Sequence, residues 1–162
     1  MVPSKSLTPR VGSERGAELV EFALVFPLLL LVVLGIVDFG FMFQRMEVVT
    51  NAAREGARIA VLPGYGISDV NARVCNYLSA GGVPTVGCGT TNPRITVDGF
   101  GSPFTIPLGA GTTPMSGKRV TVVYSHQYSF IGPFTSLFGA AFSSVAVRAV
   151  AIMRDEAQAP GP

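Results

Sequence analysis

Residues 14–43 read ERGAELVEFALVFPLLLLVVLGIVDFGFMF, an apolar run that comes after a polar leader. From Phe22 to Phe43 the only charged residue is Asp38, and these 22 residues match the roughly 20 that a helix needs to cross a bilayer. A charged fraction of 14% is low for a wholly soluble protein. A chain of 162 residues has room for one membrane segment and one modest domain. We therefore predict a transmembrane helix over residues 17–43.

The charged residues before the apolar run predict its orientation. Lys5, Arg10 and Arg15 precede it with only Glu14 against them, so the positive-inside rule places the N-terminus in the cytoplasm and the rest outside. A secretory signal has a shorter apolar region that ends in small residues, and this run has no Ala-x-Ala site at its end. The segment is therefore expected to stay attached to the rest of the chain. The net charge of +2 is too small and too dispersed to indicate a nucleic-acid partner.

The helix is expected to continue beyond the membrane. Residues 1–16 read as a flexible leader, and residues 44–62 keep a helical pattern that Pro63 and Gly64 end, so they form a stalk. Pro27 lacks the amide hydrogen that the helical ladder needs, which predicts a kink near it. One face of the stalk carries small apolar residues, which can pack on this chain's own domain or let another backbone approach closely. These residues are Val49, Ala52, Ala53, Gly56, Ala57 and Ala60.

Residues 63–154 are predicted to form a small extracytoplasmic α+β domain. Residues 155–162 follow it as a flexible tail. Residues 68–80 have the pattern of a short helix, with Ser68 as its N-cap. Three later segments favour strands and predict an antiparallel sheet that packs on the stalk. These strands are residues 94–98, 119–130 and 143–154. The apolar segment 131–142 either folds under the sheet or forms an exposed contact.

The residues of this domain that carry chemistry are few. Cys75 and Cys88 both fall in the part placed outside, where an oxidising compartment favours a disulfide worth about 3 kcal/mol. Together with the single histidine, His126, they make a poor zinc set. His126 falls on the apolar face of its strand, and we interpret it as a core histidine with satisfied nitrogens. No catalytic or nucleotide-binding motif is present, so we predict no enzyme activity, no metal or other cofactor, and no small-molecule substrate.

The remaining chemistry lies where the leader meets the helix. Glu21 is an ionisable group inside the start of the membrane helix, which costs about 2.5–3.5 kcal/mol and indicates a functional site. A peptidase that cut after Gly16 would leave Ala17 with a new α-amine, mostly protonated because its pKa is about 8. Glu21 lies one turn later on the same helix face. The Ala17 ammonium of a neighbouring chain could therefore pair with Glu21 and fix the axial register between chains.

Several of these residues resemble a known family. Gly16 followed by Glu21 and Phe22 resembles the prepilin cleavage pattern of type IV pilins, especially the Flp subgroup. The longer runs RGAELVEFAL, GIVDFG and NAAREGAR resemble the TadE-like family. This resemblance covers about residues 14–62, and beyond them only the general shape of a small domain with a final strand agrees.

The resemblance implies a minor pilin or pseudopilin of the Flp/Tad tight-adherence pilus, with a pilin-like outer domain, held in the bacterial cytoplasmic membrane. A prepilin peptidase would cut between Gly16 and Ala17, and Glu21 and Phe22 would serve assembly and register. Its partners would be other pilin and pseudopilin subunits, the inner-membrane assembly platform and membrane lipid. Other pilins have Phe or Met at the first mature position, whereas this chain has Ala17, so we do not predict N-methylation.

Two other functions stay open at the level of sequence. The helix could be an uncleaved signal anchor that carries an extracytoplasmic binding or adhesion module. The chain could also be a pseudopilin-like subunit of a secretion system. Cleavage after Gly16 separates the first of these from a processed pilin.

Overall fold

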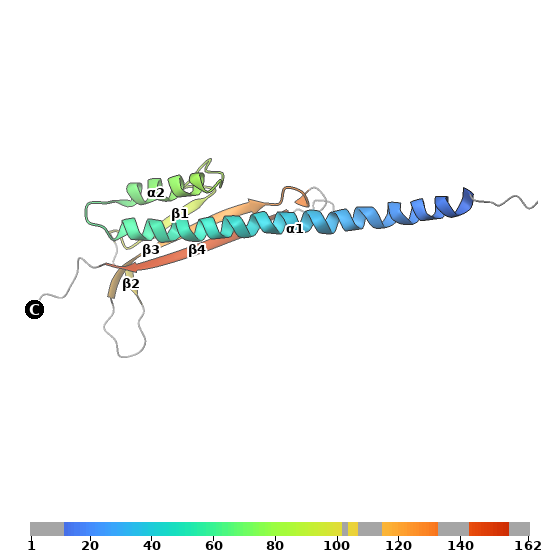
Figure 1. Cartoon of the computed structure of the whole chain (residues 1–162). Helices are drawn as coiled ribbons and strands as arrows, with labels where there is room; N and C mark the ends of the chain where they lie inside the picture. Colours follow the sequence, from blue (N-terminus) through green and yellow to red (C-terminus); the bar gives the residue numbers. More distant parts are fainter. Residues whose placement is uncertain (1–11, 102–103, 107–114, 133–142, 156–162) are drawn as a thin grey trace, which may run out of the picture.

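The computed structural model describes residues 12–101, 104–106, 115–132 and 143–155. Within these residues the chain forms two helices followed by four strands of one sheet. The elements are α1 (Gly12–Ala60), α2 (Ile67–Ala80), β1 (Arg94–Asp98), β2 (Phe104–Ile106), β3 (Met115–Gln127) and β4 (Ser144–Arg154). This is the α+β fold that the sequence predicts, with a long N-terminal helix that leads into a small antiparallel sheet (Figure 1).

Helix α1 has two halves with different surroundings. Its C-terminal half packs against α2 and against strands β3 and β4, whereas its N-terminal half projects from the domain alone (Figure 1). The helix is long and apolar enough to cross a membrane, and its most apolar window is wholly uncovered. It is continuous through Pro27, and the kink expected there stays a prediction. It begins at Gly12 rather than near Ala17, because the Glu, Arg and Ala residues around Gly16 favour helix.

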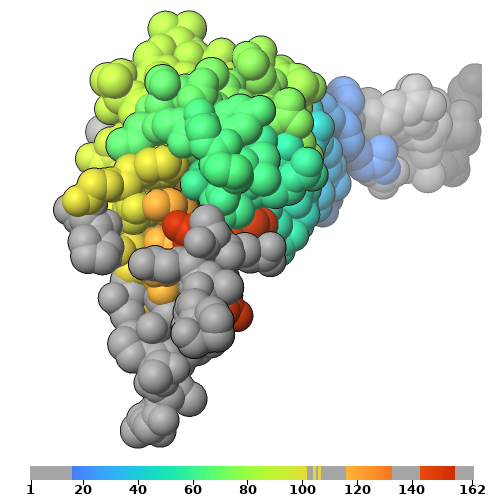
Figure 2. Space-filling view, turned by 90° about the vertical axis from the view of Figure 1, so that its left-hand side faces the viewer, coloured from blue at the N-terminus to red at the C-terminus, as the bar shows by residue number. Residues whose placement is uncertain are grey.

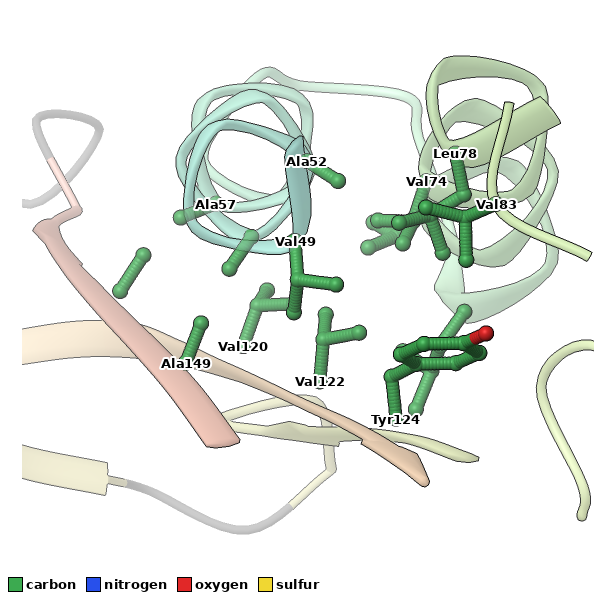
Figure 3. Packing of buried hydrophobic residues seen from close by; sticks show 14 of the residues in the cluster. Val49, Ala52, Ala57, Val74, Leu78, Val83, Val120, Val122, Tyr124 and Ala149 are labelled. Atoms are coloured by element: carbon green, nitrogen blue, oxygen red, sulfur yellow. The ribbon is translucent and has the colours of Figure 1, made fainter. Parts of the chain in front are cut away.

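The small-residue face of α1 forms the centre of the hydrophobic core, as the sequence predicts. Its buried residues meet valines and a leucine of α2 and the inward-facing side chains of β3 (Figure 3). The two helices approach so closely at Gly56 that an added Cβ would lie 2.5 Å from Val74 Cγ2 and 3.3 Å from Val120 Cγ1. Only glycine fits there without displacing a core side chain.

Strand β3 is the centre of the sheet. Strand β4 pairs antiparallel with residues 117–127 along one edge of β3, and β1 and then β2 pair antiparallel along the other. Strand β1 has the predicted bounds, whereas β3 begins four residues earlier and ends three residues earlier than the predicted strand 119–130. Strand β2 was not predicted, because it has only three residues and comes after glycines with positive φ that read as a turn.

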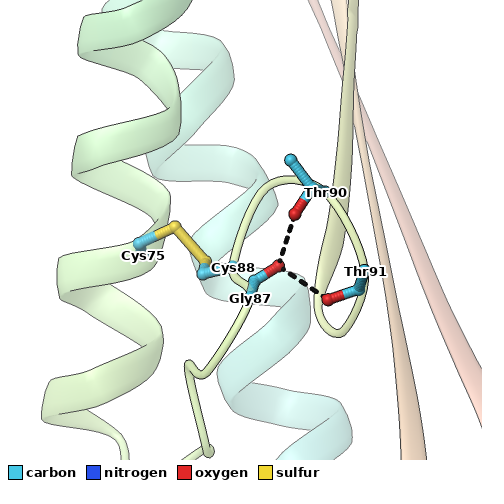
Figure 4. The surroundings of a disulfide bond; sticks show 5 residues. All are labelled: Cys75, Gly87, Cys88, Thr90 and Thr91. Carbon is cyan, nitrogen blue, oxygen red and sulfur yellow. Dashed lines mark hydrogen bonds between the residues drawn. A yellow bond between two sulfur atoms is a disulfide. The ribbon is translucent and has the colours of Figure 1, made fainter.

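Helix α2 is fixed to the domain at several points. Its N-cap is Gly66 rather than the predicted Ser68, because the carboxylate of Asp69 reaches back to accept the Gly66 N–H at 2.8 Å. The Cys75–Cys88 disulfide that the sequence predicts joins α2 to the loop after it, with Cα atoms 6.0 Å apart (Figure 4). The loop is closed by the Gly87 carbonyl, which accepts the hydroxyls of two threonines at 3.1 and 3.2 Å.

Figure 2 views the end of the domain farthest from the projecting helix, with the end of α1 and α2 in green over the upper part and the exposed half of α1 in blue extending behind. Helix α2 runs back along α1, so that Gly81 after its last turn lies against Val48. An ion pair between Arg73 Nη2 and Glu55 Oε1, 2.7 Å apart, ties α2 to α1 near this end. Of the apolar segment 131–142, residues 133–142 lie outside the described residues, so neither expectation for that segment is decided.

Candidate functional site

The predicted cleavage and assembly residues lie together on the free half of α1. Gly16, Ala17 and Glu21 are all exposed, and Gly16 has no neighbouring atom within 4 Å of the position of a Cβ. Ala17 and Glu21 are one helical turn apart. Phe22 is also exposed and stacks on its neighbour Phe26, with ring centroids 5.3 Å apart. This part of the helix is therefore open to a peptidase, to lipid or to another chain.

Glu21 has no ion pair or hydrogen bond to any other described residue of this chain. Among the described residues, its carboxylate is thus left accessible to water, lipid headgroups or a second molecule. The geometry is compatible with the predicted pairing between chains, and a single chain cannot display that pairing.

Asp38 is a buried carboxylate whose partners the sequence did not reveal. It lies inside the apolar run, yet its side chain is buried, with 1% of the residue exposed. Its Oδ1 accepts the backbone N–H of Ser129 at 3.1 Å. Its Oδ2 accepts those of Phe130 at 2.9 Å and Ile131 at 2.8 Å. Three amide donors thus offset the cost of removing this carboxylate from water.

The amides that bind Asp38 belong to the turn after β3. We call residues 128–131 the β3 corner. The last backbone bond of the β3–β4 pair is Tyr128 N–H to the Ser143 carbonyl, at 3.2 Å, and beyond it the chain leaves the sheet. Three successive N–H groups then turn toward α1, where the Asp38 carboxylate satisfies them as a cap satisfies the first turn of a helix. This contact explains why β3 ends before the predicted residue 130.

Tyr128 adds a second contact between the β3 corner and α1. Its ring lies 5.9 Å from the Phe39 ring, and its hydroxyl donates to Met42 Sδ at 3.7 Å. The domain therefore contacts α1 as far down as Asp38. The sequence did carry a signal for this contact, since Asp38 is the only charged residue in an otherwise apolar stretch of 22 residues, and such a group needs a partner.

His126 lies beside Tyr124, whose hydroxyl binds Arg45. Arg45 donates through Nη1 to the Tyr124 hydroxyl at 3.0 Å, and His126 lies beside this pair on the same face of β3. The histidine is buried as predicted, and neither of its ring nitrogens has a hydrogen-bond partner among the described residues. Burial lowers the pKa of His126, Arg45 lowers it further, and Asp38 acts in the opposite direction.

The described residues contain no group of three or more His, Cys, Asp or Glu side chains that could hold a metal ion. The hydrogen bonds of this arrangement hold the turn after β3 against α1. It presents a free apolar helix with a carboxylate near its start, and it fixes a small domain to the rest of that helix through Asp38.

The comparisons with known proteins concern the same helix. A family model described as TadE-like protein matches residues 16–58, which is α1 without its first four and last two residues. No curated protein matches the chain, and no solved structure matches it. TadE-like proteins are a pilus-associated structural family. The matched segment contains Gly16 and Ala17, where cleavage is predicted, together with Glu21 and Asp38.

Proposed function

We propose that this chain, whose helix α1 matches the TadE-like family model over residues 16–58, is a minor pilin or pseudopilin anchored in the bacterial cytoplasmic membrane. In this role it takes part in the assembly of a Flp/Tad-type pilus for adherence. The observation that carries the proposal is the division of α1 into a wholly uncovered apolar half and a half packed into the domain. A protein with this division can leave its free half in lipid before assembly and pack it against neighbouring helices afterwards.

The length of the free half supports a membrane span. Ala17 to Val37, the part that remains after the proposed cleavage, is 21 residues or about 32 Å of helix. The hydrocarbon core of a bilayer is about 30 Å thick. Because Asp38 is bound to the domain, the span ends near Val37 in this proposal, six residues before the Phe43 limit expected from sequence. The basic leader before Gly16 then lies on the cytoplasmic side.

Processing supplies the charge that assembly needs. A prepilin peptidase removes residues 1–16 and leaves the Ala17 ammonium at the membrane surface. The Glu21 carboxylate of an adjacent subunit pairs with this ammonium as the helices align, which offsets the cost of burying Glu21 in the assembled core. The exposure of Ala17 and Glu21 in the single chain supports this pairing between subunits.

The experiment compares Glu21→Ala with Glu18→Ala, the other carboxylate of the same exposed stretch. Each variant is expressed with its native neighbours, and incorporation is measured by co-purification with sheared pili. We expect Glu21→Ala to be inserted and cleaved normally but lost from the pilus fraction, and Glu18→Ala to be incorporated. Equal incorporation of both variants would refute the register role.

The same co-purification separates the two alternative functions. Recovery with the components of a secretion machine, and not with pilus subunits, would assign the chain to secretion. Recovery of an uncleaved chain with neither set would favour a binding or adhesion module on a signal anchor.

A further inference from the structure

The β3 corner lies at the boundary between the free and the packed halves of α1. In Figure 1 the end of β3 and the turn after it reach farther toward the projecting half of α1 than the other end of the sheet does. Asp38 is the first buried residue of the described part of the helix, and it is the residue that binds the corner. The corner is thus held at the level where the uncovered apolar run stops.

The corner presents an apolar side chain at this level. Phe130 is 43% exposed even though its own N–H is bound to Asp38. Phe39 and Phe41 on the adjacent turns of α1 are 47% and 45% exposed. Aromatic rings are enriched where the hydrocarbon core of a bilayer meets the headgroups. If these three rings faced water, the domain would expose a patch of apolar surface, and such patches commonly mark contacts with a membrane or a partner.

The length of the helix places these rings at that depth. If Ala17 lies at the cytoplasmic edge of the hydrocarbon core, the 21 residues to Val37 cross it, and Asp38 enters the opposite headgroup region. The β3 corner is bound to Asp38 through backbone bonds of 2.8–3.1 Å, so it cannot lie far from the same plane. The three amide bonds also allow a carboxylate to lie there without a counter-charge.

We propose that the β3 corner is a second membrane contact, in which Phe130 enters the interfacial region of the same bilayer that α1 crosses. The domain then contacts the membrane both where α1 leaves the bilayer and at Phe130. These two contacts restrict its orientation relative to the membrane surface. Asp38 acts as the positioning residue, because it fixes the corner to the helix at the depth where the span ends. This inference rests on the proposed membrane anchoring, and the occupant of the surface is lipid.

The chain has no tryptophan, so a single introduced tryptophan reports depth without background. Three variants of the full chain are reconstituted in phosphatidylcholine vesicles: Phe130→Trp, Leu30→Trp in the middle of the span, and Tyr65→Trp. Tyr65 lies in the loop between α1 and α2 and is 48% exposed, close to the 43% of Phe130. Quenching is measured with lipids brominated either near the headgroup end of the acyl chains or near the bilayer centre. We expect Phe130→Trp to be quenched most by the shallow bromines, with emission blue-shifted from that of Tyr65→Trp.

The outcomes are distinguishable. If Phe130→Trp behaves like Tyr65→Trp while Leu30→Trp is quenched by the deep bromines, the corner is not a membrane contact and the anchored helix stands. If Leu30→Trp is not quenched either, the proposed membrane anchoring fails. A blue shift of Phe130→Trp without quenching, growing with the protein-to-lipid ratio, would assign the surface to a second copy of the chain and overturn the inference.

A further variant tests the positioning role of Asp38. In the Phe130→Trp background, Asp38→Ala removes the acceptor of three corner amides. We expect weaker shallow quenching of the introduced tryptophan in the corner, with the quenching of Leu30→Trp unchanged by the same substitution. Unchanged shallow quenching in the corner would show that Asp38 does not set its depth.

Discussion

Replacement of Asp38 by alanine tests how firmly the domain is fixed to α1. The variant removes the acceptor of three backbone N–H groups, at 2.8, 2.9 and 3.1 Å. Hydrogen bonds to a charged group contribute about 1.5–3 kcal/mol each. The three do not add fully, because Ser129 and Phe130 are exposed and their freed amides can bind water. We therefore expect a loss of about 3 kcal/mol in the free energy that keeps the β3 corner closed.

The assay is amide hydrogen exchange of the full chain in detergent micelles, measured at Ser129, Phe130 and Ile131. A loss of about 3 kcal/mol corresponds to roughly 100-fold faster exchange at these amides, since about 1.4 kcal/mol is tenfold. Asp38→Asn keeps one acceptor oxygen but brings an amide donor against another donor, so we expect an intermediate acceleration. The control is Glu47→Ala, an exposed carboxylate on the same helix, which should leave these rates within twofold.

Exchange rates at all three amides that stayed within twofold of the parent in Asp38→Ala would refute the capping role of this carboxylate. Equal acceleration by Glu47→Ala would refute it as well, because the effect would then come from helix charge and not from the capping bonds.

Three further substitutions have expected outcomes that derive from the fold. Gly56→Ala places a Cβ 2.5 Å from a core valine and should lower stability by about 1–3 kcal/mol in thermal unfolding, whereas Gly40→Ala, with open space around it, should not. Replacement of both Cys75 and Cys88 by serine should lower the free energy of unfolding by about 3 kcal/mol. If the parent protein ran at the same mobility on a non-reducing gel before and after treatment with a reductant, that result would contradict the disulfide. The pKa of His126 is lowered on folding, so unfolding takes up a proton and stability should fall as pH drops below about 6.5. His126→Phe should flatten that part of the pH profile.

The sequence predicted the features that depend on periodicity and composition. The apolar run, the small-residue face around Gly56 and the alternating strand β1 each obey one repeat, and a repeat is visible in a single sequence. The disulfide could also be predicted, because the prediction required only two cysteines and an oxidising compartment. Each of these features is carried by residues that lie near each other along the chain or share one pattern.

The features that were missed depend on contacts between distant segments. Asp38 binds amides 91 to 93 residues away, and no local pattern shows which backbone turns toward it. The early end of β3 has the same cause. The two unpaired nitrogens of His126 also result from packing, since strand alternation predicted the buried face but not what lies opposite it.

The mature N-terminus tests most directly whether this chain is a processed pilin-like subunit. Intact-mass measurement and N-terminal sequencing are made on the protein extracted from membranes of cells that hold the prepilin peptidase. A control pair is Gly16→Val and Gly35→Val, two positions where an added Cβ meets no atom within 4 Å. We expect a chain that begins at Ala17 in the parent and in Gly35→Val, and an uncut chain in Gly16→Val. A parent chain that begins at Met1 or Val2 would contradict the processed-pilin function.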